Sequence, residues 1–315
     1  MVDAIEEAAA TKAGSFSAWG HRKIWAMLRR DGVRVSQSSV KRALARRGLL
    51  LPVRYQAERR LQAKARKAVF VSPPTRRNRI WQLDFSDFET DAGGTWQIGA
   101  VLDYVAKFSF AAHSTATQTG GDAVAVLKAA IEDAELVMGK PLLEDCRHPE
   151  TGEVHPLVIV TDNGSAFKSE TFRRFIASRP ELVHVRTRYR SPQTNGVVER
   201  FNESLKYEHL YREEIQSGHL LAIECSVFRH LYNDVRPHES LGFGTPREAY
   251  LATPASPPEP VKNFRRSSLG YLVPHTPEGG DEPLTLGTPV TAEGELADPA
   301  EPGTPTAAAS APPKP

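Results

Sequence analysis

Hydrophobic residues in the middle of the chain first alternate with polar residues and then follow a helical period. The runs 80–88, 96–103 and 107–113 are rich in β-branched and aromatic residues and are separated by turn residues, so they predict three consecutive strands. Apolar positions three and four residues apart then predict a helix over 122–137, and the unbroken apolar run 157–161 predicts a buried strand. Strands in series followed by alternating helices and strands are typical of a mixed α/β domain.

The pattern continues in shorter elements toward the C-terminus. We expect a helix over 169–177, a strand over 182–186, a long helix from 193 to about 211 and a further helix over 220–232. After residue 254 the periodicity ends, and 14 of the 24 prolines of the chain fall in 254–315. Such a segment cannot bury enough apolar surface to order itself, so we predict that this tail is disordered.

Near the N-terminus the pattern predicts two short helices between residues 20 and 48. The first presents Ile24, Met27 and Leu28 on one face, and the second begins after Ser36, a favourable N-cap residue. A helix, a short turn and a basic helix are typical of a helix-turn-helix, whose second helix enters the DNA major groove. A plain helical hairpin fits the pattern as well. The exposed positions that would contact DNA are Gln37, Ser38, Lys41, Arg42 and Arg46.

Charge is distributed unevenly along the chain, although the net charge is only +2. Residues 1–79 hold 19 Lys and Arg against 5 Asp and Glu, which indicates a polyanionic partner such as DNA; a solvated basic arm is the alternative. Within this region, 1–19 shows little pattern and 51–79 reads as a basic linker. The two cysteines, the absence of a signal-peptide pattern and the absence of a long apolar run predict an intracellular protein without a membrane partner.

Asp84 is the first of three candidate metal-binding carboxylates. Strand alternation places Gln82 and Asp84 on the opposite face of the strand from Trp81 and Leu83. An Asp inside an otherwise apolar strand is costly unless it has a partner, and a cation is one such partner. A buried Asp that is only hydrogen-bonded is the simpler alternative.

Asp162 and Glu199 complete the set. Asp162 follows the apolar run 157–161, at the carboxyl end of a strand, where sites form in open α/β sheets. Glu199 falls in the first turns of the long helix, and Glu203, one turn later, is a backup ligand. Alone, Asp162 could be a turn former and Glu199 a surface charge. Three carboxylates that meet could hold two divalent cations, an arrangement suited to in-line attack at phosphorus.

Five segments, taken together, resemble a known family. They are Trp19-Gly20-His21-Arg22-Lys23-Ile24 through Leu49, Trp81-x-x-Asp84-x-Ser86, Thr161-Asp162-Asn163-Gly164-Ser165, Ser191 through Glu199 to Lys206, and Tyr232-Asn233-x-x-Arg236-Pro237-His238 through Pro246. Their order resembles that of the DDE transposases and integrases with a retroviral-integrase-like core. The likeness is strongest to the catalytic, OrfB-like part of IS3-type insertion-sequence transposases.

The resemblance implies a fold and a division of the chain. The fold is α/β, an RNase H-like mixed five-stranded sheet with flanking helices, preceded by a small all-α helix-turn-helix domain. The expected parts are an N-terminal arm (1–19), a helix-turn-helix DNA-binding segment (20–50), a basic linker (51–79), an integrase catalytic core with a C-terminal helical extension (80–253) and a disordered tail (254–315).

The resemblance also implies the chemistry. Asp84, Asp162 and Glu199 would be the catalytic residues and would bind two Mg²⁺ ions, for which Mn²⁺ can substitute. The reaction would be cleavage and transfer of DNA strands at the ends of an insertion element. Further DNA contacts are expected from Lys206, Arg200, Asn163, Gln193 and Asn195.

The expected partners follow from that reaction. They are double-stranded DNA of the element ends and of the target, further copies of the chain in a synaptic complex, and the DNA-binding product of an upstream reading frame. The expected location is the bacterial cytoplasm, with nucleoid association on DNA. Two rival functions stay open, a non-catalytic element-encoded DNA-binding regulator and an RNase H-like nuclease. One departure from the family is the 36 residues between Asp162 and Glu199, about one more than usual.

Overall fold

A mixed β-sheet organises the larger part of the molecule. The computed structural model describes residues 2–51, 74–187, 196–254, 256–258, 265–266 and 271–273. β1 (Ile80–Glu89) is an inner strand of the sheet, antiparallel to β2 (Thr95–Asp103) and parallel to β4 (Leu157–Thr161). β3 (His113–Thr115) pairs with β2, and β5 (Leu182–Thr187) pairs with β4. The expected five strands are therefore present, in the order β3-β2-β1-β4-β5.

Two short strands extend the sheet beyond β5. β7 (Tyr271–Val273) is parallel to β5, and β6 (Arg265–Arg266) is antiparallel to β7. Both lie in 254–315, so the prediction that this whole segment is disordered does not hold for these two strands. For most of the remaining tail it stays a prediction, because those residues lie outside the described ranges.

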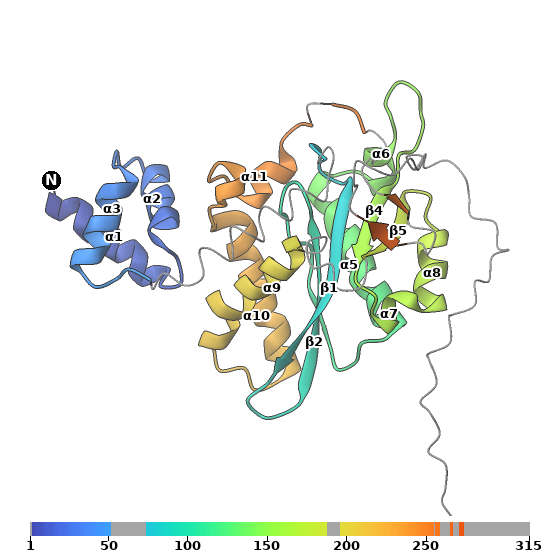
Figure 1. Cartoon of the computed structure of the whole chain (residues 1–315), viewed down its shortest axis with the longest axis horizontal. Coiled ribbons are helices and arrows are strands. Elements are labelled where there is room, and N and C mark those ends of the chain that lie inside the picture. Colours follow the sequence, from blue (N-terminus) through green and yellow to red (C-terminus); the bar gives the residue numbers. More distant parts are fainter. Residues whose placement is uncertain are drawn as a thin grey trace, which may run out of the picture.

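Helices cover both faces of the sheet (Figure 1). α5 (Gly120–Met138) and α8 (Glu170–Ala177) lie on one side of β1 and β2, while α9 (Gly196–Glu208) and α10 (Gly218–His230) lie on the other. The short α7 (Ser165–Lys168) joins the α5 side. In the described part of the chain, no helix is both long and apolar enough to pass through a bilayer.

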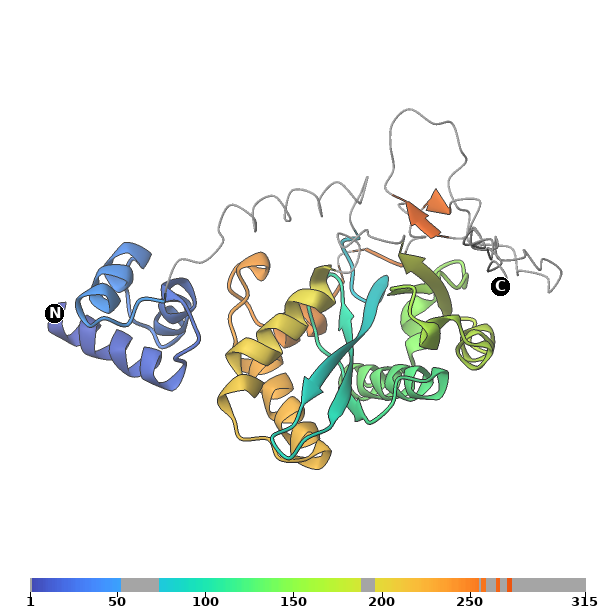
Figure 2. The ribbon, with the colours of Figure 1, turned by 60° about the horizontal axis from the view of Figure 1, so that its bottom comes forward.

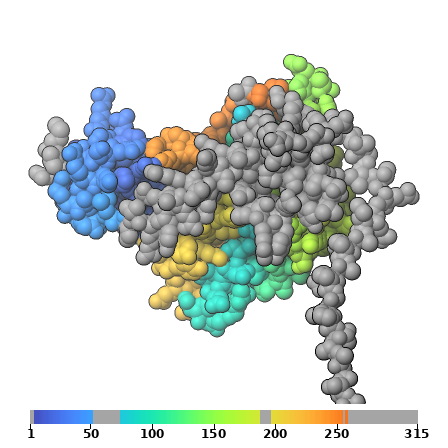
Figure 3. Space-filling model, viewed as in Figure 1, coloured from blue at the N-terminus to red at the C-terminus, as the bar shows by residue number. Residues whose placement is uncertain are grey.

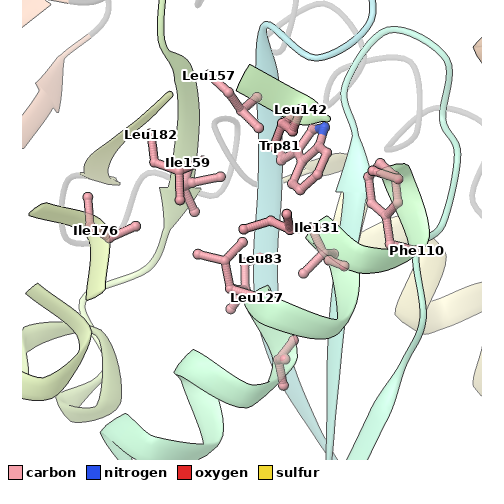
Figure 4. Close-up of a cluster of buried hydrophobic side chains, with 14 of the residues drawn as sticks. Trp81, Leu83, Phe110, Leu127, Ile131, Leu142, Leu157, Ile159, Ile176 and Leu182 are labelled. Atoms are coloured by element: carbon pink, nitrogen blue, oxygen red, sulfur yellow. The ribbon is translucent and has the colours of Figure 1, made fainter. Parts of the chain in front are cut away.

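Alternation along β1 decides which side chains face each layer. Trp81 and Leu83 are fully buried beside Leu127 and Ile131 of α5 (Figure 4). Phe88, on the opposite face of the strand, packs in the cluster built by α9 and α10. The predicted assignment of faces is confirmed, and the face that carries Gln82 and Asp84 is the one covered by α9.

The third strand begins later than the sequence predicted. In place of a strand over 107–113, Ser109 makes a single antiparallel bridge to Leu102, and β3 starts at His113. The side chain of Asn233 donates to the Ser109 carbonyl (2.7 Å) and accepts from its N–H (3.0 Å). These bonds take the place of a neighbouring strand at Ser109. The buried Phe108 and Phe110 nevertheless gave this segment the alternating pattern of a strand.

The N-terminal region is a bundle of three helices. α2 (His21–Arg30) and α3 (Gln37–Arg46) were expected, and Ser36 caps α3 by accepting a hydrogen bond from the Ser39 N–H. The segment expected to be an arm forms α1 (Val2–Ser15) instead. Its buried positions include Ala9 and Ala13, whose small side chains leave only a weak hydrophobic pattern in the sequence.

These three helices lie beside the α9 to α11 side of the larger domain (Figures 2 and 3). Lys23 of α2 forms an ion pair with Glu208 of α9 (2.9 Å), and Arg30 pairs with Glu248 of α11 (Pro246–Leu251) at 2.7 Å. The Trp25 ring meets the Phe243 ring edge to face, with centroids 5.2 Å apart. Polar and aromatic contacts together therefore join the two regions.

Candidate active site

The three candidate carboxylates come from three elements that meet at the carboxyl end of β4. Asp84 lies within β1, Asp162 directly follows β4, and Glu199 is in the first turn of α9. The parallel register pairs Gln82 with Val160. Continued by two residues, that register brings Asp84 level with Asp162 on the neighbouring strand.

A buried glutamine fixes α9 against the same strand. Gln82 is 1% exposed, and its Oε1 accepts hydrogen bonds from the N–H groups of Val197 (2.9 Å) and Val198 (3.1 Å). Those N–H groups belong to the first turn of the helix, where they have no partner within the helix. Because Gln82 and Asp84 share a face of β1, this cap holds the turn that carries Glu199 near Asp84.

The charges of the other two carboxyl groups act on Asp84. Burial raises the pKa of Asp84, and the negative charges of Asp162 and Glu199 raise it further, to about 7. Hydrogen bonds from the Phe85 N–H and from Asn202 act in the opposite direction without cancelling the effect. The cluster therefore carries like charges whose repulsion a bound cation would relieve.

Asn202 is a further polar residue at this site, which the sequence analysis did not assign to it. Its side chain is buried, and its Nδ2 donates to Asp84 Oδ2 at 3.4 Å. Its Oδ1 is buried without a hydrogen-bond partner among the described residues. The available signal was its position three residues after Glu199, which places it on an adjoining helix face.

The donor set suits a hard divalent cation. Carboxylate and amide oxygens are the ligands that Mg²⁺ and Mn²⁺ prefer. Among the described residues, no group of three or more His, Cys, Asp and Glu side chains is arranged so that it could hold a metal ion. The structure thus brings the carboxylates together without drawing them into a coordination geometry.

The other residues expected to contact DNA phosphate fall around this cluster. Lys206 is half-buried on α9; burial lowers its pKa, while the charges of Asp87 and Asp84 oppose that shift. Arg200 is exposed beside Glu199, and Asn163 is half-buried in the turn after β4. Gln193 and Asn195 lie outside the described residues, so their roles stay predictions.

Behind the site, α9 continues into a buried ion-pair network. Glu208 accepts two hydrogen bonds from Arg236, from Nη2 at 2.6 Å and from Nε at 2.8 Å, as well as the one from Lys23. The C-terminal end of α9, the helix that carries Glu199, is therefore fixed both to the segment that contains Arg236 and to α2, which contains Lys23.

Two family models match this chain. A model described as "HTH-like domain" matches residues 2–57, and one described as "Integrase core domain" matches residues 181–246. The chain is 28% identical over 242 residues to transposase InsD of insertion element IS2A/D/F/H/I/K from Escherichia coli, with 75% of this chain and 74% of the relative covered. InsD of element IS2D from strain K12 matches equally well. The chain thus resembles an HTH-like domain and an integrase core domain over these ranges, and the InsD transposases over three quarters of its length.

Solved integrase structures resemble this chain at low identity. The catalytic core of HTLV-2 integrase in complex with magnesium, in its dimeric form, is 20% identical with a TM-score of 0.39, covering 56% of this chain and 97% of that chain. An intasome of simian T-cell lymphotropic virus with PP2A regulatory subunit B56 gamma is 18% identical with a TM-score of 0.46. The match covers 78% of this chain and 76% of that chain. Scores this low have no bearing on the roles of individual residues.

Most of the expected DNA contacts of the HTH-like domain are exposed on α3. Ser38, Lys41 and Arg42 are exposed, and Gln37 is half-buried. Arg46, by contrast, donates from Nη2 to Glu6 of α1 at 2.8 Å. That partner was hidden from the sequence analysis, which assigned no helix to the first 19 residues.

The end of the predicted basic linker faces inward. Arg76 and Arg77 lie 3.1 and 3.5 Å from the buried carboxylate of Asp145. Arg79 is buried and donates to the carbonyls of His155 and Pro156. These three cations hold the start of the core, so they do not add to the basic surface of the linker. The linker residues 52–73 lie outside the described part of the chain.

Proposed function

We propose that this chain cuts and joins DNA strands at the ends of an insertion element, with Asp84, Asp162 and Glu199 as its catalytic carboxylates. The observation that supports the proposal is the placement of these three groups on β1, after β4 and in the first turn of α9, which meet at the carboxyl end of β4. The integrase core and the HTH-like domain both imply DNA binding.

The three carboxylates would hold two Mg²⁺ ions, or Mn²⁺ in their place. Ions held there would supply the activation of an attacking hydroxyl and the stabilisation of the leaving oxygen of a scissile phosphate. The protein itself fixes the ligands: Gln82 orients the first turn of α9, and Asn202 holds one oxygen of Asp84. Lys206 and Arg200 would contact phosphate, with Asn163, Gln193 and Asn195 around them.

The HTH-like domain would hold the DNA near the core. Gln37, Ser38, Lys41 and Arg42 would face the major groove, whereas Arg46 would have to leave Glu6 to contact DNA. Two element ends must be paired before they are joined, so we propose that two or more copies act together. The product of an upstream reading frame is a further proposed partner, and the bacterial cytoplasm and nucleoid are the proposed location.

A strand-transfer assay tests this function. Purified full-length protein is mixed with labelled duplexes that carry the DNA boundaries flanking its own gene, with Mg²⁺, Mn²⁺ or EDTA. We expect metal-dependent nicking and joined products. Nicking without joining would indicate a nuclease. DNA binding without any reaction, even after the upstream product is added, would indicate a non-catalytic regulator and refute the proposal.

Replacing Asn202 with alanine should slow cleavage by roughly 10- to 100-fold, the usual effect of removing a group that orients a metal ligand. The Mg²⁺ concentration for half-maximal activity should rise, because Asp84 loses the hydrogen bond that holds its Oδ2. Rates across a Mg²⁺ titration provide the measurement. An unchanged titration curve would show that Asn202 only fills space.

A further inference from the structure

Two tyrosines near the end of α9 are unusually exposed. Tyr207 is 69% exposed and Tyr211 is 58% exposed, whereas Tyr232 and Tyr250 are buried in the core. Large aromatic side chains in water are a common mark of a binding surface, because burying them on a partner is favourable. Tyr207 and Tyr211 are called the tyrosine pair below.

The pair is held in place from beneath. The two rings meet edge to face, with centroids 5.3 Å apart, and Tyr211 stacks on Phe88 at 6.0 Å. Phe88 is only 7% exposed and packs in the core with Leu205 of α9. Arg212 Nε also donates to the Tyr207 carbonyl at 3.3 Å. The exposed rings therefore have a fixed support.

The tyrosine pair lies on the same two elements, α9 and β1, as two of the three carboxylates or directly against them. Glu199, Glu203 and Tyr207 are exposed at intervals of four residues along α9, so they lie on one stripe of the helix. Eight residues of helix place Tyr207 about 12 Å along the axis from Glu199. On β1, Phe88 lies four residues after Asp84 on the same face, which is about 13 Å. Both estimates correspond to about three or four stacked nucleotides at 3.4 Å each.

The pair also lies toward the HTH-like domain. Arg212 Nη1 donates to Ser17 Oγ at 2.6 Å, which ties the segment containing Tyr211 to the linker between α1 and α2. The tyrosine pair therefore lies between the three carboxylates and the contact with the HTH-like domain.

Nearby charge favours a base over a phosphate as the ligand. Lys206 and Arg212 flank the tyrosines, but the exposed Glu203, Glu213 and Glu214 offset them. A mixed surface of this kind does not form a track for the phosphate backbone. Aromatic faces instead stack on unpaired bases of any sequence, because every base has a π-face.

We propose that Tyr207 and Tyr211 stack on an unpaired base of the DNA end, three or four nucleotides from the bond that is cut. The inference rests on the proposed function, since it takes the three carboxylates as the cutting site. It adds a class of ligand to that function, namely an unstacked nucleobase. It also explains why this end of α9 carries aromatic side chains.

The test compares DNA ends that differ only in pairing. Full-length protein is titrated without metal, so that cleavage plays no part, into a fluorescent duplex that is either fully paired or unpaired over its last four nucleotides. The variants are Tyr207→Ala with Tyr211→Ala, and Tyr207→Phe with Tyr211→Phe. We expect the wild type to bind the unpaired end more tightly than the paired one. In the alanine variant, the ratio of the two dissociation constants should fall by roughly 5- to 150-fold. The phenylalanine variant should keep it, because the stacking face is retained.

Controls separate the remaining outcomes. Leu136→Ala, which removes another highly exposed apolar side chain, should bind both duplexes like the wild type. Equal binding of both duplexes by the wild type and the alanine variant overturns the proposal. So does a loss of dimers in sedimentation without a change in base preference, because the pair would then be a contact between copies. A tyrosine-dependent preference without strand cutting in Mg²⁺, even after the upstream product is added, would refute the proposed function alone.

Discussion

Replacing Glu199 with glutamine is expected to reduce DNA cleavage and strand joining by at least about 100-fold, because a metal ligand matters more than the groups that orient it. Glutamine keeps the size of the side chain and removes its negative charge. Glu199 is exposed, so folding should be unaffected. DNA binding without metal should also persist. Single-turnover cleavage rates and anisotropy titrations measure the two effects separately.

Glu203→Gln is the matched control for this prediction. It removes the same charge from the same exposed stripe of α9, one turn further from Gln82. Cleavage by this variant should be close to that of the wild type. The reverse result, with Glu203→Gln inactive and Glu199→Gln active, would make Glu203 the ligand and would contradict the assignment made from the first turn of α9.

Replacing Glu208 with alanine should cause the largest loss of stability, about 3 kcal/mol. Removing one partner of a buried ion pair leaves the other buried and unpaired, and such changes cost about 3 to 5 kcal/mol. Here the stranded charge is Arg236, which is 8% exposed. The lower end of the range applies because Lys23 and Glu208 keep some exposure. Urea denaturation followed by circular dichroism provides the measurement.

The effect of Glu208 should depend on pH. Burial alone would raise its pKa, but the hydrogen bonds and charges of Arg236 and Lys23 prevail and lower it from the ordinary 4.5 to about 2. Since the pKa is lower in the folded state, the stabilisation is complete above pH 4.5 and is lost as the pH falls toward 2. The stability difference between wild type and variant should therefore shrink in acid.

Glu170→Ala is the control for stability. Glu170 pairs with Arg173 and Arg174 on the exposed surface of α8, where such pairs contribute at most about 1 kcal/mol. Its replacement should leave the unfolding curve nearly unchanged at every pH. A loss as large as that of Glu208→Ala would show that burial is not the cause.

The sequence predicted those parts of the site that depend on local pattern. Strand alternation made Asp84 a candidate metal ligand, and its place after an apolar run made Asp162 another, while the family resemblance implied that the two act together with Glu199. The face of β1 that meets α9 also followed from alternation. Each inference from pattern needs only the neighbouring residues, because period and turn chemistry are local properties.

Residues whose roles depend on distant partners were missed. The cap from Gln82 to Val197 spans 115 positions, and the bonds from Asn233 that replace a strand at Ser109 span 124. The pairing of Arg46 with Glu6 could not be foreseen without α1. A sequence pattern indicates whether a polar residue is buried or exposed. It does not show which distant residue is its hydrogen-bond or ion-pair partner.

The spacing of two glutamates on α9 limits how this gene can change in length. Glu199 and Glu208 are nine residues apart, which is two and a half turns, so they point in opposite directions from the helix axis. One faces the carboxylate cluster and the other holds Arg236 and Lys23. A codon inserted between them would turn one relative to the other by about 100°. In-frame insertions and deletions should therefore be rare at 200–207 and more frequent in the surface loops.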